Sequence, residues 1–235
     1  MSRPPNNRPL VGYRRIGMLA SLFLQAVHGT LHIIKTALMK LTGRTDYNRW
    51  ANLENYLAWW QPRTEKVAKL IPNGTRVLEF GAGNRHLESL LAKDCEYIPS
   101  DLVDRGPGTV ICDLNKRPLP DLSYLMAHVG VFVGVLEYIS DLPTLIEWLS
   151  TQVLFCVVSY DCIKTSTIGP RRLAELIRRA YHGYMSYYTQ RELILLFERN
   201  GFSCTKTESW HNQELFAFSK AASADAAVHL PKTAA

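Results

Sequence analysis

The sequence predicts an α/β fold built on a mostly parallel sheet, and three observations support this class. Residues 76–87 read as a short strand, a glycine turn and the start of a helix. Residues 129–133 are apolar throughout, as in a central strand that is buried on both faces. Acidic residues stand at the ends of three successive strand-like segments, namely Glu79, Asp101 and Asp113. Open sheets of this kind bind nucleotide-like ligands beyond the carboxyl ends of their strands.

The glycine turn favours one kind of nucleotide over another. Gly81 and Gly83 let the backbone take unusual angles and let a ligand come close. His86 stands where dinucleotide sites place their third glycine, so that fingerprint fails. Glu79 would repel a pyrophosphate but could pair with an ammonium group. A nucleoside that carries a positive charge therefore fits better than a dinucleotide.

At these residues the sequence resembles the class I S-adenosylmethionine (SAM) dependent methyltransferases. Their first motif reads apolar-apolar-Glu/Asp-x-Gly-x-Gly, and residues 77–83 match it, although Arg85 replaces a further glycine that the family often has. The resemblance covers about residues 70–220. It implies a Rossmann-like, seven-stranded, mostly parallel sheet with helices on both faces, SAM as the cofactor, and no metal site.

The resemblance also implies which residues hold the cofactor. Asp101 follows Glu79 by 22 residues, and an acid at this place can accept from both ribose hydroxyls. Asp113 would accept from the adenine amino group. The expected cofactor-binding residues are Glu79, Gly81, Ala82, Gly83, Asp101, Leu102, Asp113, Leu114 and Gly134.

The acceptor side is predicted from three further segments. Residues 134–141 resemble a family segment commonly written Val-Leu-Glu-His-Ile, with Tyr138 in place of the histidine. A tyrosine is a poor base, with an ordinary pKa of about 10, but it can orient a substrate by a hydrogen bond. Tyr160 and Asp161 end a strand-like segment, where the resemblance puts them beside the transferred methyl group. We expect catalytic roles for Tyr138 and Tyr160, and substrate contacts for Tyr56, Trp59 and Asp161.

The chain divides into three parts. Residues 1–69 are predicted to be a basic, amphipathic helical extension, residues 70–220 the SAM-binding domain, and residues 221–235 a disordered tail. Residues 1–45 contain seven Lys or Arg and no Asp or Glu, so the basic charge belongs to the N-terminus. Five cysteines without paired spacing favour free thiols in a reducing compartment. We expect a cytoplasmic protein.

Residues 16–41 predict an amphipathic helix with a polar and an apolar face. Three interpretations stay open: a lid packed on the domain surface, an interfacial membrane helix, and a cleaved targeting peptide. Gln25, His28 and His32 disfavour a transmembrane span. The second interpretation predicts peripheral membrane contact from the cytoplasmic side.

Three other segments carry structural predictions. Within residues 46–66, helical spacing predicts core packing for Trp50, Leu53, Leu57 and Trp60. Residues 170–182 predict a basic helix with a solvated face. Thr189 and Glu192 have the spacing of a capping box at the start of another helix.

These patterns lead to one favoured function and two alternatives. The favoured function is SAM-dependent methyl transfer to O, N or C of a small-molecule, glycan or lipid acceptor, with no nucleic-acid partner. The first alternative is a non-catalytic binding protein that keeps the SAM fold. The second is a nicotinamide-dependent reductase, against which His86 and the expected C-terminal hairpin argue.

Overall fold

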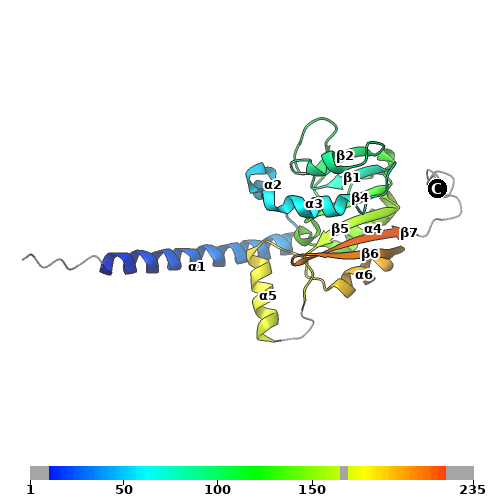
Figure 1. Ribbon diagram of the computed structural model, residues 1–235. Coiled ribbons are helices and arrows are strands. Elements are labelled where there is room, and N and C mark those ends of the chain that lie inside the picture. Colours follow the sequence, from blue (N-terminus) through cyan, green and yellow to red (C-terminus); the bar gives the residue numbers. More distant parts are fainter. Residues whose placement is uncertain (1–10, 165–168, 221–235) are drawn as a thin grey trace, which may run out of the picture.

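The computed structural model describes residues 11–164 and 169–220, and for residues 11–26 it describes the backbone alone. The prediction of a disordered tail over residues 221–235 lies outside this range, as do residues 1–10 of the predicted N-terminal extension. An α/β domain carries a long N-terminal helix, α1 (Val11–Thr42), which extends away from the domain (Figure 1).

A seven-stranded sheet forms the centre of the domain, in the order β3-β2-β1-β4-β5-β7-β6. The strands are β1 (Arg76–Phe80), β2 (Glu96–Asp101), β3 (Val110–Ile111), β4 (Val129–Val133), β5 (Phe155–Tyr160), β6 (Phe202–Trp210) and β7 (Gln213–Lys220). The first five strands pair in parallel, and β7 runs antiparallel to β5 and β6. The strand order reverses between β1 and β4, where open sheets form a ligand crevice. The predicted fold class is confirmed.

The central strands are apolar because both faces of the sheet are covered. Alternate side chains of a strand point to opposite faces, so Val77 and Val131 join one core cluster while Leu78 and Phe132 join the other. Helices α4 (Leu142–Gln152) and α6 (Gln190–Glu198) cover the Leu78 face. Helix α3 (Gln61–Ala68) and the short helix η3 (His86–Leu90) cover the other.

The segment after the glycine turn forms little helix. The sequence predicts the start of a helix there, whereas only the 3₁₀ helix η3 forms. Arg85, which precedes it, has a left-handed backbone (φ 58°), and Leu91 is already extended. A left-handed residue does not start an α-helix in the usual way, so the segment makes little more than one turn.

The aromatic segment before β1 does not form one helix. It is divided into α2 (Tyr47–Ala51), η1 (Leu53–Asn55) and η2 (Ala58–Trp60), because Asn52, Tyr56 and Leu57 have extended backbones. Leu53 and Leu57 are 47% and 46% exposed, so the prediction of core packing is wrong for these two residues. We refer to residues 47–60 as the cover segment.

Helix α1 contacts the domain through its polar face. The hydroxyl of Thr36 is buried and donates to the carbonyl of Ala180 in α5 (Pro170–Tyr181) at 2.8 Å, and Gly29 faces the ring of Tyr181. The opposite, apolar face is exposed to between 41% and 82%, at Val27, Leu31, Ile34, Leu38 and Leu41. A lid packed on the domain surface would bury this face, so the structure does not support the first interpretation of residues 16–41.

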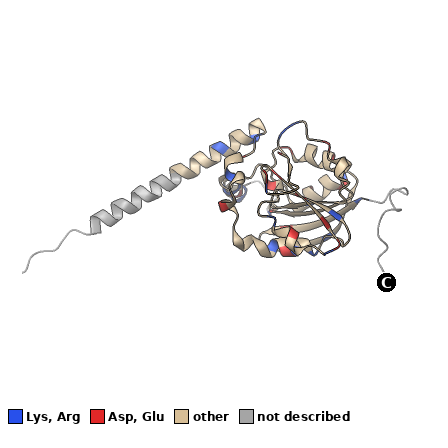
Figure 2. Ribbon diagram, turned by 90° about the horizontal axis from the view of Figure 1, so that it is seen from above, with Lys and Arg blue, Asp and Glu red and all other residues tan. Residues whose placement is uncertain are grey.

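The charge on α1 is of one sign. Figure 2 shows blue positions and no red ones on its described part, which contains Lys35 and Lys40. Among the described helices, none has both the length and the apolar character needed to cross a membrane.

The last helix begins as predicted. The Thr189 hydroxyl accepts from the Glu192 N–H at 3.2 Å, and the Glu192 carboxylate accepts from the Thr189 N–H at 2.8 Å. This capping box satisfies two backbone N–H groups at the start of α6.

Candidate active site

The glycine turn requires glycine for two reasons. Gly81 and Gly83 have left-handed backbones, with φ of 69° and 53°. A Cβ on Gly81 would lie 2.7 Å from Cγ2 of Val135, and one on Gly83 would lie 2.1 Å from the ring of Tyr56. The cover segment therefore packs directly on the turn through Tyr56.

Glu79 at the end of β1 is a buried carboxyl group with a close partner. It is 4% exposed, and its Oε2 accepts a hydrogen bond from the Tyr97 hydroxyl at 2.5 Å. Burial, which disfavours the charged form, raises the pKa of Glu79 to about 8. A cationic ligand beside this group would favour its ionised form.

Asp101 at the end of β2 is held from several sides. Its Oδ2 accepts from the Gly83 N–H at 2.8 Å, and its Oδ1 accepts from the Leu102 N–H at 2.7 Å. Arg105 faces the same carboxylate, with Nη2 3.3 Å from Oδ1 and Nε 3.3 Å from Oδ2. Both side chains are buried, so this ion pair is shielded from water.

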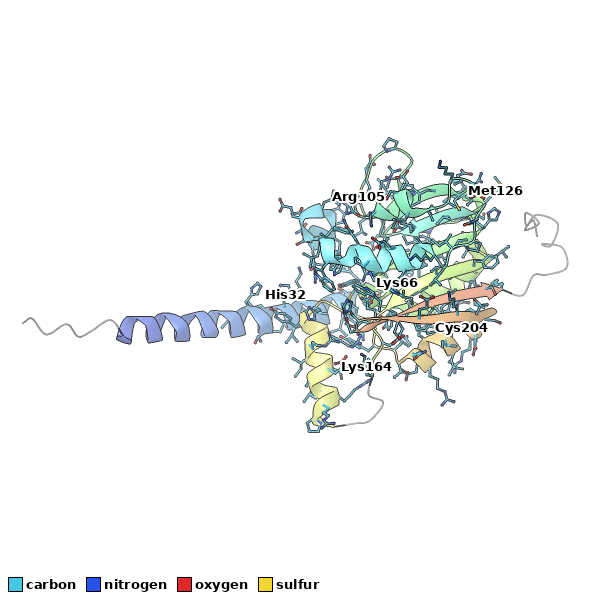
Figure 3. The ribbon with its side chains drawn as sticks, viewed as in Figure 1. His32, Lys66, Arg105, Met126, Lys164 and Cys204 are labelled. Carbon is cyan, nitrogen blue, oxygen red and sulfur yellow. The ribbon has the colours of Figure 1, made fainter. Side chains whose placement is uncertain are left out.

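Arg105 also ties the cover segment to the sheet. Its guanidinium donates to the carbonyls of Trp50 at 2.6 Å and Ala51 at 2.9 Å, and it lies beside α2 in Figure 3. The same guanidinium contacts Asp101, so the position of the cover segment is linked to that carboxylate.

Asp113 follows β3 and keeps one oxygen available. Its Oδ1 accepts from the Thr45 hydroxyl at 2.6 Å and from the Asn115 N–H at 3.0 Å. Oδ2 has no hydrogen bond to any described residue, and Asp113 lines the cavity described below. An amino group of a ligand could donate to this oxygen.

One cavity of about 400 Å³ runs along the carboxyl edge of the sheet, from Asp113 after β3 to Gln213 at the start of β7. Most of the residues predicted to form the site line it: Tyr56, Trp59, Glu79, Gly81, Ala82, Asp101, Leu102, Asp113, Leu114, Gly134 and Tyr138. Gly83, Tyr160 and Asp161 do not. Gly83 lies beneath the Tyr56 ring. It therefore contributes to the conformation of the turn but does not line the cavity.

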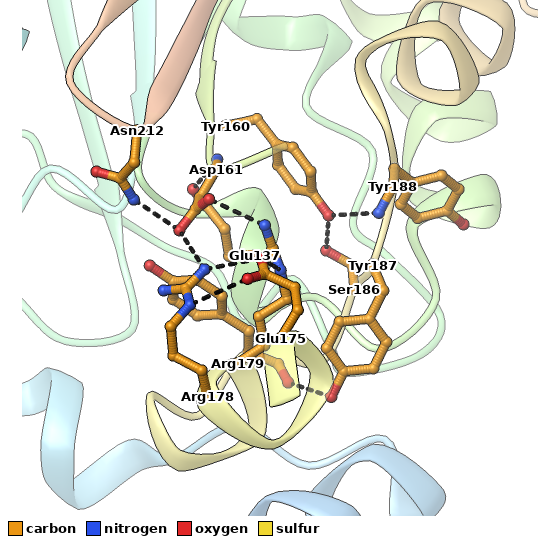
Figure 4. A network of polar contacts seen from close by, with 11 residues as sticks. Glu137, Tyr160, Asp161, Glu175, Arg178, Arg179, Ser186, Tyr187, Tyr188 and Asn212 are labelled. Atoms are coloured by element: carbon orange, nitrogen blue, oxygen red, sulfur yellow. Dashed lines mark hydrogen bonds and ion pairs between the residues drawn. The ribbon is translucent and has the colours of Figure 1, made fainter. Parts of the chain in front are cut away.

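Tyr160 points into the protein interior. Its hydroxyl lies 2.9 Å from the Ser186 hydroxyl and accepts from the Tyr188 N–H at 3.2 Å (Figure 4). Burial raises the pKa of Tyr160 above its ordinary value. The described structure thus places Tyr160 away from the cavity, contrary to the expected catalytic position, because a strand-end side chain on this face of β5 meets the core.

Asp161 is the centre of a buried ion-pair network (Figure 4). Its Oδ1 accepts from Arg179 at 2.9 Å, and its Oδ2 accepts from Asn212 at 2.9 Å and from Arg178 at 3.4 Å. Arg179 is fully buried, so the prediction of a solvated basic face on α5 is wrong for this residue. The carboxylate that was expected to contact substrate instead anchors α5.

Tyr138 does line the cavity, within an aromatic cluster. The centre of its ring lies 4.5 Å from that of the Trp50 ring and 5.3 Å from that of the Tyr184 ring, and both pairs are packed edge to face. Burial raises the pKa of Tyr138 above its ordinary value, so the hydroxyl stays protonated near neutral pH. A protonated hydroxyl fits the expectation that Tyr138 does not act as a base, and its role in orienting an acceptor stays a prediction.

Sequence reasoning assigned no role to two charged residues of the cavity. Glu137 is buried, its Oε1 accepts from the Asp161 N–H at 2.9 Å, and its Oε2 has no partner among the described residues. Burial raises the pKa of Glu137 to about 7. Arg63 of α3 donates from Nη1 to Gln213 at 2.9 Å, while its buried Nε has no described partner. In the sequence, the only sign that Glu137 belongs to the site is its position next to Tyr138, and Arg63 has no such sign.

A family model described as a methyltransferase domain matches residues 49–207. The chain belongs to this methyltransferase family. The predicted class, a SAM-dependent methyltransferase, is therefore confirmed, and with it SAM as the cofactor. No curated protein has a matching sequence.

Solved structures share the fold of this methyltransferase. The mitomycin 7-O-methyltransferase MmcR aligns with a TM-score of 0.58 at 12% identity, over 83% of this chain and 68% of its own. NcsB1, an O-methyltransferase from neocarzinostatin biosynthesis that was solved with S-adenosylhomocysteine and 1,4-dihydroxy-2-naphthoic acid, aligns with a TM-score of 0.54 at 15% identity, over 82% of this chain and 69% of its own. Human N-acetylserotonin methyltransferase, solved with SAM, gives 0.54 at 12%, over 84% and 68%. At such identities the likeness establishes the fold.

The residues of this methyltransferase fit its cofactor, and one contact competes with it. Glu79 suits a cationic methionine amine, the free oxygen of Asp113 suits the adenine amino group, and both line the same cavity. Asp101 suits the ribose hydroxyls, but Arg105 contacts both of its oxygens. A ribose that binds to Asp101 would compete with Arg105 for this carboxylate.

Proposed function

We propose that this methyltransferase transfers the methyl group of SAM to an oxygen or nitrogen of a small-molecule acceptor. The observation that carries the proposal is the single cavity that joins the strand-end acids to an aromatic, charged chamber beyond β4. That chamber is lined by Trp59, Trp60, Arg63, Glu137, Tyr138, Tyr184 and Trp210. Its size and its mixture of apolar walls and a few polar groups are typical of small-molecule sites.

The protein contributes mainly alignment. Bound SAM supplies an electrophilic methyl group, and Glu79, Asp101 and Asp113 would hold it at the β1–β3 end of the cavity. The aromatic walls and Tyr138 would orient the acceptor at the other end. Holding two reactants in place can lower a barrier by about 7–11 kcal/mol.

Glu137 is the general base in this proposal. Its Oε2 is unpartnered, it lines the acceptor end of the cavity, and its pKa of about 7 suits proton uptake near neutral pH. As the acceptor oxygen or nitrogen gains the methyl group, its proton would pass to Oε2 of Glu137. The hydrogen bond from the Asp161 N–H to Oε1 keeps the carboxyl group oriented.

Two measurements test the function. Calorimetry should show SAM and S-adenosylhomocysteine binding, and no binding of NADH. Incubation with methyl-labelled SAM and separate aqueous and lipid extracts of source cells should label at least one compound. Absence of SAM binding by the folded protein would refute the proposal.

We further propose that α1 brings the enzyme to an anionic membrane surface from the cytoplasmic side. The outward apolar face of α1 supports this, as do Leu173, Ile177 and Tyr181, which are exposed on the neighbouring α5. Residues 1–45 contain seven basic residues and no acid, and each basic residue near anionic lipid contributes about 1 kcal/mol.

Flotation with anionic liposomes tests the membrane proposal. The full chain should float at low salt and less at high salt, and the double variant Leu31→Glu/Leu38→Glu should stay at the bottom. Met126→Glu/Leu195→Glu is the matched control, because these exposed residues lie outside α1 and α5. If the wild type stays at the bottom and forms dimers that Leu31→Glu/Leu38→Glu dissociates, the face binds a second copy and the membrane proposal is wrong.

A further inference from the structure

Arg63 is a buried arginine held in a fixed position at the cavity wall. It is 6% exposed, and its guanidinium lies 5.5 Å from the Trp60 ring and 5.8 Å from the Trp210 ring. Its Nη1 donates to Gln213, and a Cβ on Gly134 would lie 2.6 Å from the same atom. The side chain is thus fixed between α3, the end of β4 and the start of β7.

The positive charge of Arg63 has no counter-ion in direct contact in the described structure, and Glu137 acts on it only from a longer distance. Arg105 pairs with Asp101, and Arg179 pairs with both Asp161 and Glu175. No described carboxylate lies within ion-pair distance of Arg63, and the hydrogen bond to Gln213 uses one of its five N–H donors. An arginine that is buried without a counter-ion is costly, so this one is suited to an anion that enters the cavity.

The location of Arg63 indicates which ligand brings the anion. Gly134 follows β4 and Gln213 begins β7, whereas Asp101 and Asp113 follow β2 and β3 on the other side of β1. Arg63 therefore stands away from the acids expected to hold ribose and adenine, between Gly134, an expected cofactor contact, and the aromatic chamber. The surrounding tryptophan rings favour a flat, apolar body next to the charged group.

We propose that Arg63 binds a carboxylate of the acceptor, and that the acceptor is a planar aromatic acid. The proposal rests on the proposed function, since it specifies the substrate class of the same site. A guanidinium can bind a carboxylate through two parallel hydrogen bonds, and the ring of the acid would lie against Trp60 or Trp210. The hydroxyl or amine to be methylated would then face Glu137.

Calorimetry with matched probes tests the proposal. The probes are 2-naphthoate and its neutral isostere 2-naphthamide, titrated into the full-length protein with and without S-adenosylhomocysteine. The wild type should bind the acid about tenfold or more tightly than the amide, which corresponds to ~1.4 kcal/mol. Arg63→Gln should remove this preference, and Arg63→Lys should keep part of it, because lysine retains the charge but lacks the fork. Arg191→Gln, at an exposed position on α6, is the control and should leave the ratio unchanged.

Several outcomes would overturn the proposal. One is equal binding of acid and amide by the wild type, which needs no variant to observe. Another is a preference that survives in Arg63→Gln. A third is an Arg63→Gln protein that binds S-adenosylhomocysteine more weakly but keeps its preference for the acid, since Arg63 would then serve the cofactor carboxylate. If S-adenosylhomocysteine fails to bind at all, the proposed function fails, while the acid-to-amide ratio still reports on Arg63.

Discussion

Replacing Arg105 by methionine is expected to tighten SAM binding and to weaken the ligand-free fold. Two backbone N–H groups and the Arg105 guanidinium together contact both oxygens of Asp101. A carboxylate offers about four lone-pair sites. Three of them accept hydrogen bonds here, from the Gly83 and Leu102 N–H groups and from Nη2 of Arg105, and Nε of Arg105 lies 3.3 Å from Oδ2 without a hydrogen bond. The two ribose hydroxyls therefore compete with Arg105 for Asp101, and removing Arg105 removes this competition.

The magnitude follows from the geometry of the ion pair. A hydrogen bond that involves a charged group contributes about 1.5–3 kcal/mol. The 3.3 Å distances are long for such a bond, so the lower end of that range applies. Since ~1.4 kcal/mol is a factor of ten, SAM affinity should rise about tenfold. In the ligand-free variant Asp101 stays buried without its partner, which costs about 3–5 kcal/mol.

The assay combines calorimetry with thermal melting. Arg105→Met should show a lower dissociation constant for SAM, a lower melting temperature without SAM, and a larger rise on adding it. Arg76→Met is the matched control, because Arg76 pairs with Glu96 at 2.7 Å at the opposite end of the sheet. That control should leave the dissociation constant unchanged.

An equal or weaker affinity of Arg105→Met for SAM would refute the reasoning. Arg105 would then support the bound state, either through Asp101 or by holding the cover segment. Asp101→Ala is a poorer experiment, because it also removes the acceptor for the Gly83 and Leu102 N–H groups. Weaker SAM binding in that variant would not separate ligand contact from loss of the turn.

Three further predictions concern the same site. Gly81→Ala should weaken SAM binding by distorting the turn, because the new Cβ would clash with Val135 even without a ligand. Gly108→Ala is the control for backbone strain alone, because Gly108 is also left-handed but has open space around it. Equal SAM affinities in the two variants would contradict the steric argument. Glu137→Gln should lower the methylation rate about a hundredfold or more. It should also abolish the rise in rate through about pH 7 that is expected when a base with the Glu137 pKa of about 7 becomes ionised. An unchanged pH profile would exclude Glu137 as the base. Because the pKa of Glu79 is raised to about 8, the folded state binds the extra proton, so stability should fall as pH rises from about 5 to 8, and denaturation of Glu79→Gln should show a flatter dependence.

The nucleoside end of the site could be predicted from sequence for a topological reason. Glu79, Asp101 and Asp113 are far apart in the chain but each ends or follows a parallel strand. Parallel neighbours bring their carboxyl ends to one edge, so three local patterns combine into one cavity.

The acceptor end depends on packing that has no local signature. Arg63 and Arg179 both lie on short basic helices, and sequence does not tell which arginine will be buried. Asp161 follows a strand as Asp101 does, but α5 presents Arg179 to it, and the ion pair draws the carboxylate out of the cavity.

The orientation of α1 could not be predicted either. Its sequence defines a polar and an apolar face, but not which of them meets the domain. The orientation is seen at Thr36, whose buried hydroxyl donates a hydrogen bond to α5. With Thr36 on the side of the domain, the apolar residues of α1 face outward.

The turn between β6 and β7 contributes to one end of the cavity only. Trp210, Asn212 and Gln213 reach the acceptor end from this short connection, beside Trp59 and Trp60 of the cover segment, whereas the acids of the nucleoside end follow β1, β2 and β3. A change of length or sequence in such a hairpin is tolerated more easily than a change in the parallel strands. Acceptor choice could thus diversify among descendants of this gene while cofactor use stayed constant, and exchanging the hairpin between homologues is a direct route to new substrate preferences.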